Sequence, residues 1–190
     1  MMLFHNLSFR QQCALKQLLV RGVPSRVLQL IALCFLAGLG GDFQCALGLA
    51  EFFAGQCAVT NGFLYYGIAA EAYEYKFDNV CNDIMSRAGF AYALGMVLRL
   101  EPGAAVWFGI VCSTWVWMCR GSTGRSEINV LGTDMGDVRK ANQMVSRVCL
   151  LYTVAIAKGI AAFLEQPVTS LMHLYSRFQD MLLDLARQAL

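Results

Sequence analysis

Short apolar runs that are broken by glycine and polar residues are the feature that most restricts the fold of this chain. Three stretches carry no charge: Val27–Gly41, Phe52–Ala70 and Pro102–Cys119. The last two are about as long as a membrane-spanning helix. However, glycine, tyrosine and amide residues interrupt Phe52–Ala70, and Pro102–Cys119 opens with Pro-Gly. Runs of this kind are typical of buried strands in a parallel sheet, so we favour such a sheet over a bundle of membrane helices.

The composition agrees with one folded domain and excludes several other classes of protein. The 190 residues are 57% hydrophobic and only 15% charged, which excludes a disordered chain. The net charge of +2 is too small to hold a protein on nucleic acid by bulk charge alone. None of the eight cysteines forms a C-x-x-C pair, and there are only two histidines, which disfavours a zinc site. Cysteines in apolar runs favour a reducing, intracellular compartment, nuclear or cytoplasmic.

The N-terminal segment, residues 1–41, differs from the rest of the chain. Its basic residues are Arg10, Lys16, Arg21 and Arg26. They precede Val27–Gly41, an apolar stretch that ends in small residues, as in a signal peptide or signal anchor. The alternative, which we favour, is an amphipathic or buried helix packed against the domain. We therefore separate this segment, a helix or a targeting sequence, from a folded domain over 42–190, and expect a chain that begins near Asp42 to fold by itself.

Strand and helix patterns alternate along the folded domain. Strand patterns cover Cys45–Phe53, Ile68–Tyr73, Ala104–Val111 and Ile160–Leu164. Helix patterns cover Ala58–Tyr66, Met85–Leu98, Val138–Lys158 and Ser170–Leu190. This alternation predicts an α/β fold, a three-layer Rossmann-like sandwich with a mainly parallel sheet. Ligands of such sheets bind at the carboxyl ends of the strands, near the point where the strand order reverses.

A glycine turn and an acidic residue follow the first two predicted strands. Gly55 allows a tight turn and the close approach of a ligand, although the dinucleotide fingerprint G-x-G-x-x-G is absent. Glu74 lies 19 residues after Gly55, a spacing that suits a carboxylate bound to ribose hydroxyls. Glu71 is a competitor inside the strand. The alternative is that both glutamates are solvated surface charges.

Cys112 and Glu165 follow the third and fourth predicted strands. A thiolate is a nucleophile, and Arg120 and Arg125 lie near Cys112 in the sequence, where they would favour the thiolate. An inert buried thiol is the alternative. Glu165 is expected to face a cleft, because burying an unpaired carboxylate is costly. We therefore expect Cys112 and Glu165 to face one cleft.

Taken in order, these residues resemble the motifs of the DNA cytosine-5 methyltransferases. Glu51–Gly55 resembles that family's loop for S-adenosylmethionine, Val111–Ser113 its Pro-Cys motif, and Glu165–Pro167 its Glu-Asn-Val motif. The cofactor-binding residues that the resemblance implies are Phe53, Ala54, Gly55 and Gln56, with Glu74 on the ribose and Asp83 beside the adenine. The implied catalytic residues are Cys112 and Glu165, and the implied contacts to substrate are Ser113, Thr114, Arg120 and Arg125.

The chain departs from the family's pattern in several places. Val111 stands where the family has proline, and Gln166 where it has asparagine; a Gln-x-Arg-x-Arg motif and the last strands of the sheet are missing. The resemblance therefore implies a divergent or truncated relative. Its activity would be methyl transfer to a flipped-out nucleic-acid base, with DNA favoured and no metal required. The alternatives are an inactive cofactor-binding or interaction domain, and a membrane-anchored protein.

Overall fold

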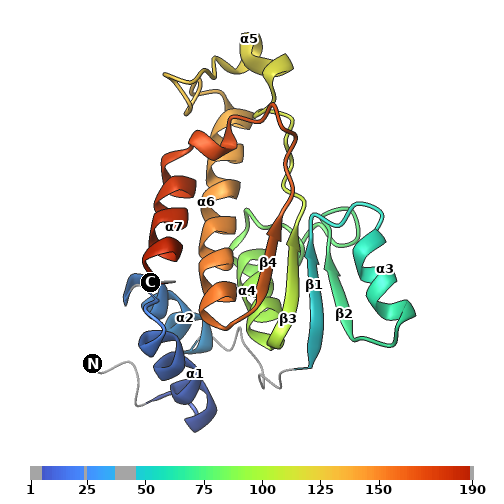
Figure 1. The fold of residues 1–190 in the computed structure, drawn as a ribbon, viewed down its shortest axis with the longest axis vertical. Coiled ribbons are helices and arrows are strands. Elements are labelled where there is room, and N and C mark those ends of the chain that lie inside the picture. Colours follow the sequence, from blue (N-terminus) through green and yellow to red (C-terminus); the bar gives the residue numbers. More distant parts are fainter. Residues whose placement is uncertain (1–5, 24, 37–45, 189–190) are drawn as a thin grey trace.

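A parallel sheet forms the centre of the molecule. The computed structural model describes residues 6–23, 25–36 and 46–188. Its strands are β1 (Leu47–Phe52), β2 (Ala70–Tyr73), β3 (Leu100–Phe108) and β4 (Ala161–Leu164). Every neighbouring pair is parallel, in the order β2-β1-β3-β4 (Figure 1). The predicted α/β fold with a parallel sheet is confirmed.

Helices lie on both faces of this sheet. They are α1 (Phe9–Val20), α2 (Ser25–Leu36), α3 (Ala58–Tyr65), α4 (Arg87–Arg99), α5 (Arg120–Thr123), α6 (Gly136–Ala157) and α7 (Ser176–Gln188). Helices α4 and α6 pack together against one face, α7 packs on α6, and α3 packs against β1 and β2. Because successive side chains of a strand point to opposite faces, Glu51 faces α3, while Phe52 lies with Phe108 on the face that α6 covers through Tyr152.

Aromatic rings fill the core between the sheet and α4 and α6. The ring of Phe52 stacks on Phe108 at a centroid distance of 4.9 Å and lies 5.3 Å from Tyr73. All three rings are buried. Each buried ring of this size stabilises the fold by about 1.5–3 kcal/mol. These residues end β1, β2 and β3, so the core fixes the strand ends that carry the candidate site.

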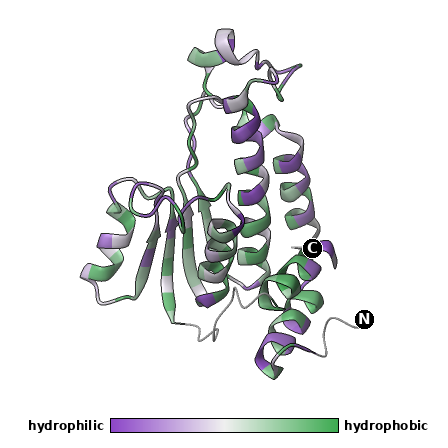
Figure 2. Ribbon diagram, turned by 180° about the vertical axis from the view of Figure 1, so that it is seen from behind, coloured by the Kyte–Doolittle hydropathy of each residue, from purple (hydrophilic) through white to green (hydrophobic). Residues whose placement is uncertain are grey.

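The N-terminal helices belong to the same hydrophobic core. Leu15 and Leu18 of α1 are buried, and α2 is predominantly hydrophobic (Figure 2) and buries five side chains, including Ile31 and Phe35. The guanidinium of Arg21 also donates to the carbonyl of Ala157 at 2.7 Å. The predicted stretch Val27–Gly41 is thus a buried helix as far as Leu36, and its residues 37–41 lie outside the described residues. In the part of the chain that the structure describes, no helix is long and apolar enough to cross a membrane. The boundary placed at 41/42 lies outside the described residues.

Among the strands, the third differs most from its prediction. It begins four residues earlier and ends three residues earlier than Ala104–Val111. Leu47 pairs with Leu100 but Leu49 pairs with Ala105, so β3 holds three extra residues in a bulge that contains Pro102-Gly103. A bulge accommodates proline and a glycine with positive φ inside a strand. As a result Cys112 lies four residues beyond the strand end.

The final predicted helix is divided. A short 3-10 turn, Met172–Leu174, precedes α7, which begins only at Ser176. Similarly, the long loop after β3 contains a 3-10 turn, Trp117–Cys119, and the short helix α5.

Cys45, at the start of the first predicted strand, lies outside the described residues. The remaining elements agree with their predicted ranges to within a few residues.

Candidate functional site

The loop after β1 is tightly wound and open on one side. Phe53, Gly55 and Cys57 all have positive φ, of 60°, 54° and 55°. A positive φ at a non-glycine residue costs about 1–3 kcal/mol and persists only where surrounding contacts impose it. Here the amide of Phe53 donates to the carbonyl of Tyr73 at 2.8 Å, and the amide of Cys57 to that of Ala54 at 2.7 Å. A Cβ atom built on Gly55 meets nothing within 4 Å, so the space above Gly55 is open.

Glu74 directly follows β2 and reaches this loop. Its carboxylate accepts a hydrogen bond from the amide of Gly55 at 2.9 Å and from the amide of Lys76 at 3.2 Å. The competing residue, Glu71, instead forms an ion pair with Arg99 and accepts a hydrogen bond from the hydroxyl of Tyr92. The structure therefore brings Glu74, not Glu71, to the glycine turn.

Asp83 lies in a segment that is packed beside Glu74. Its carboxylate accepts a hydrogen bond from the amide of Met85 at 2.8 Å, and the side chain of Asn82 donates to the carbonyl of Glu74 at 3.1 Å. A Cβ atom built on Gly89 would lie 2.0 Å from the carbonyl oxygen of Asp83, so only glycine permits this approach of α4. The segment around Asp83 is thus held at the same rim as Glu74.

Cys57 at the end of the loop is not an activated thiol. Partial burial raises its pKa, and the carboxylates of Glu51 and Glu74 raise it further. A cysteine becomes a strong nucleophile when its surroundings favour the thiolate, and these surroundings do the reverse. Cys57 therefore shapes the loop through its backbone.

A pocket of about 530 Å³ lies beyond the carboxyl ends of β1, β3 and β4. Phe53, Cys112, Ser113 and Glu165 are among the residues that line it. The strand order reverses between β1 and β3, which is the place where open parallel sheets bind ligands. The structure thus brings Cys112 and Glu165 to one pocket, next to the first residue of the loop after β1.

Gln166 joins the two segments that form this pocket. Its side-chain amide donates to the carbonyl of Ile110 at 2.7 Å, and its oxygen accepts a hydrogen bond from the hydroxyl of Ser170 at 3.0 Å. Further along, the amide of Leu171 donates to the carbonyl of Trp115 at 2.9 Å. Sequence reasoning noted Gln166 only as a departure from a motif, since no local pattern signals a bond to a carbonyl 56 residues away.

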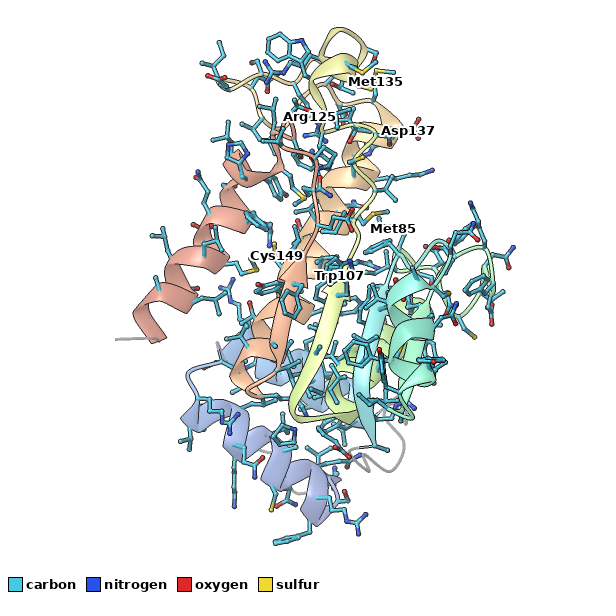
Figure 3. All side chains as sticks on the ribbon, turned by 45° about the vertical axis from the view of Figure 1, so that its right-hand side comes forward. Met85, Trp107, Arg125, Met135, Asp137 and Cys149 are labelled. Carbon is cyan, nitrogen blue, oxygen red and sulfur yellow. The ribbon has the colours of Figure 1, made fainter. Side chains whose placement is uncertain are left out.

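Arg125 is buried within the loop region that follows the pocket (Figure 3). It is only 2% exposed, and its guanidinium lies 3.5 Å from the ring centroid of Trp115 and donates to Asn142 at 2.9 Å and to the carbonyl of Val130. Burial lowers the pKa of Arg125 to about 10, so it stays protonated at neutral pH. In this arrangement the side chain holds its own loop together and is not presented to a substrate.

The other predicted substrate contacts do not line one common pocket. Arg120 stacks on Trp117 at 3.6 Å and lines a separate pocket with Ser170 and His173. The hydroxyl of Thr114 lies 3.4 Å from the guanidinium of Arg125. Of the four predicted substrate contacts, Ser113 alone is among the residues that line the pocket of Cys112.

Comparison of the chain with protein-family models, with curated proteins and with solved structures gave no match. Within the described residues, no group of three histidine, cysteine or acidic side chains could hold a metal ion. The chemical groups at the site are the thiol of Cys112 and the carboxylate of Glu165 in one pocket, next to the open loop at Gly55 and the carboxylate of Glu74.

Proposed function

We propose that this chain is a methyltransferase-like domain that binds S-adenosylmethionine and resembles the DNA cytosine-5 methyltransferases. One observation carries the proposal: Cys112 and Glu165, 53 residues apart in sequence, line the same pocket as Phe53 of the loop after β1. A nucleophile and a base-binding carboxylate must meet in this way to act on one base. The alternation of strands and helices and the order of the motifs support the same proposal.

The residues at the loop after β1 fit the cofactor. The open space at Gly55 leaves room for a ligand against the backbone, and Glu74 offers carboxylate oxygens at the rim of the loop. A ribose diol donates two hydrogen bonds, which a carboxylate accepts well. Phe53, Ala54 and Gln56 would contact the cofactor from the loop, with Asp83 beside the adenine. S-adenosylmethionine would supply an electrophilic methyl group.

The protein's own groups would act on a flipped-out cytosine. The thiolate of Cys112 would add to C6, while Glu165 hydrogen-bonds the base edge and polarises the ring. This addition makes C5 the carbon that accepts the methyl group. Loss of the C5 proton to solvent and departure of the Cys112 thiolate would then restore the aromatic ring. Ser113 would contact the bound base from the pocket wall.

Calorimetry with S-adenosylmethionine tests the cofactor site. Glu74→Ala should weaken binding by about 1–3 kcal/mol, because it removes a charged acceptor of hydrogen bonds. Glu101→Ala is the matched control, since Glu101 is exposed near the opposite end of the sheet. Unchanged affinity of the Glu74 variant would refute this site.

Trapping tests the catalytic pair. DNA that contains 5-fluorocytosine should form a covalent adduct with the full chain in the presence of S-adenosylmethionine, because fluorine blocks the loss of a proton from C5. Cys112→Ser should abolish the adduct and leave cofactor affinity nearly unchanged, since a serine hydroxyl is a far weaker nucleophile. An adduct that persists in Cys112→Ser would remove Cys112 from the mechanism.

An inactive cofactor-binding domain is the second candidate, and the charge of the pocket favours it. Among the described residues that line the pocket, Glu165 carries a negative charge and none is a lysine or an arginine. Nucleic acid is held chiefly through its phosphates by cationic side chains. Binding of S-adenosylmethionine without methyl transfer to DNA or RNA would assign this second function.

A further inference from the structure

The outer face of α1 combines exposed apolar side chains with positive charge. Lys16 lies seven residues after Phe9, and Val20 lies eleven residues after it. The three side chains therefore share one side of the helix, opposite the buried Leu15 and Leu18. Phe9 is 80% exposed and Val20 is 86% exposed. Side chains that are this exposed do not pack in the hydrophobic core of the described residues. We call Phe9, Lys16 and Val20 the outer face of α1; Arg10 lies about 100° around the helix from Phe9, on a neighbouring side.

The charge around this face has one sign. Arg10, Lys16, Arg21 and Arg26 are all exposed, and the sequence contains no aspartate or glutamate before Asp42. Residues 1–41 therefore carry a formal charge of +4, whereas the remaining residues, with 11 basic and 13 acidic side chains, carry −2. In Figure 1, α1 lies at the end of the molecule opposite α5. The positive charge of α1 and α2 thus lies at the end of the molecule opposite α5.

A cavity of about 270 Å³ lies between α1 and the ends of α4 and α6, on the side of α1 that carries Arg10 and Leu18. Arg10, Arg21 and Lys158 line it, together with Cys13, and no carboxylate is present among the described lining residues. Arg21 and Lys158 donate to the carbonyls of Ala157 and Leu98, at the ends of α6 and α4, at 2.7 and 2.8 Å. These bonds hold both cations on the cavity wall, where the guanidinium of Arg21 has further N–H groups that can meet an anion.

We propose that the outer face of α1 docks on an anionic phospholipid surface. Exposed Phe9 and Val20 would enter the boundary between headgroups and acyl chains, as the apolar side chains of interfacial helices do. Lys16 and Arg10 would meet the negative headgroups, and the cavity would take one headgroup phosphate between Arg10 and Arg21. The apolar side chains favour a membrane over nucleic acid, because nucleic acid gives a buried valine no apolar surroundings.

Flotation of the full chain with vesicles tests this proposal. The chain should float with phosphatidylcholine vesicles that contain about 30% phosphatidylserine, and far less with phosphatidylcholine alone. Arg10→Gln with Lys16→Gln should lower the partition coefficient about fivefold for each charge removed. Phe9→Ser with Val20→Ser should lower it at least as much. Raising salt from about 0.1 M to about 0.5 M should weaken binding of the unmodified chain, because salt screens the charges.

The matched control is Ile128→Ser with Val168→Ser. These side chains are 99% and 100% exposed and belong to loops outside α1 and α2, so the control removes similar apolar surface elsewhere. It should leave vesicle binding unchanged. Equal flotation with both vesicle types, or an equal loss in Phe9→Ser with Val20→Ser and in the control Ile128→Ser with Val168→Ser, would overturn the proposal. So would loss of DNA binding or of self-association in Phe9→Ser with Val20→Ser while vesicle binding stays constant.

Discussion

At the residue scale, Glu51 shows that a motif residue can have a structural task. It is buried, and one carboxylate oxygen accepts hydrogen bonds from the amide of Thr60 at 2.7 Å and from the hydroxyl of Thr60 at 2.6 Å. Thr60 lies in the first turn of α3, where backbone amides lack partners within the helix. Glu51 therefore fastens α3 to the end of β1, and so positions the loop between them.

Replacing Thr60 tests this role. Thr60→Val keeps the shape of the side chain but removes a donor from a buried carboxylate, so the free energy of unfolding should fall by about 1–3 kcal/mol. Thr60→Ser keeps the hydroxyl and should lose less than half as much. Urea denaturation of the three proteins measures the difference. Equal stability of Thr60→Val and the unmodified chain would mean that the hydroxyl contributes nothing.

At the element scale, the pair α1 and α2 contributes to the core that the sheet domain uses. Leu15, Ile31 and Phe35 belong to the same buried cluster as the strands. A chain that begins near Asp42, which the sequence pattern presents as self-sufficient, would expose the apolar surface that these side chains cover. We therefore expect it to show a lower melting temperature than the full chain and to bind the dye ANS. A cooperative transition at an unchanged temperature would show that the two helices are dispensable.

At the scale of the whole molecule, buried titratable groups make global stability depend on alkaline pH. Burial raises the pKa of Cys149 in α6 from 9.0 to about 12, with the charge of Arg177 opposing the change. Between about pH 9 and pH 12 the Cys149 thiol therefore stays protonated in the folded state, whereas the same thiol loses its proton in the unfolded state. We therefore expect this contribution to be full well below pH 9 and to decline as the pH rises from 9 toward 12, by about 1.4 kcal/mol at pH 10.

Cys149→Ala separates this effect from other alkaline changes. The variant should be slightly less stable than the unmodified chain at pH 7, because a buried group is lost. Its stability should decline less between pH 8 and pH 10. Urea denaturation at both values measures the two slopes. Parallel declines would mean that another group, such as Tyr92 with its raised pKa, governs the alkaline limit.

The sequence by itself determined the kinds of element and their order. Apolar periodicity reports which side of a local segment is buried, and that is a property of neighbouring residues. It therefore located β1, α3, β2, α4, α6 and β4 to within a few residues. It predicted β3 but missed its bounds and its bulge, because the bulge at Pro102-Gly103 depends on the pairing of β3 with β1. It also left open whether Val27–Gly41 is an anchor or a core helix, since both have the same composition.

Only the tertiary structure decided which chemical groups meet. Cys112 and Glu165 share a pocket because β3 and β4 are neighbours and Gln166 binds the carbonyl of Ile110, contacts between residues more than 50 positions apart. Arg125, which the sequence presents as a free cation near Cys112, is buried against Trp115 instead. The physical reason is the same in both cases. The direction and burial of a side chain depend on the packing of distant elements, and a local pattern carries no information about that packing.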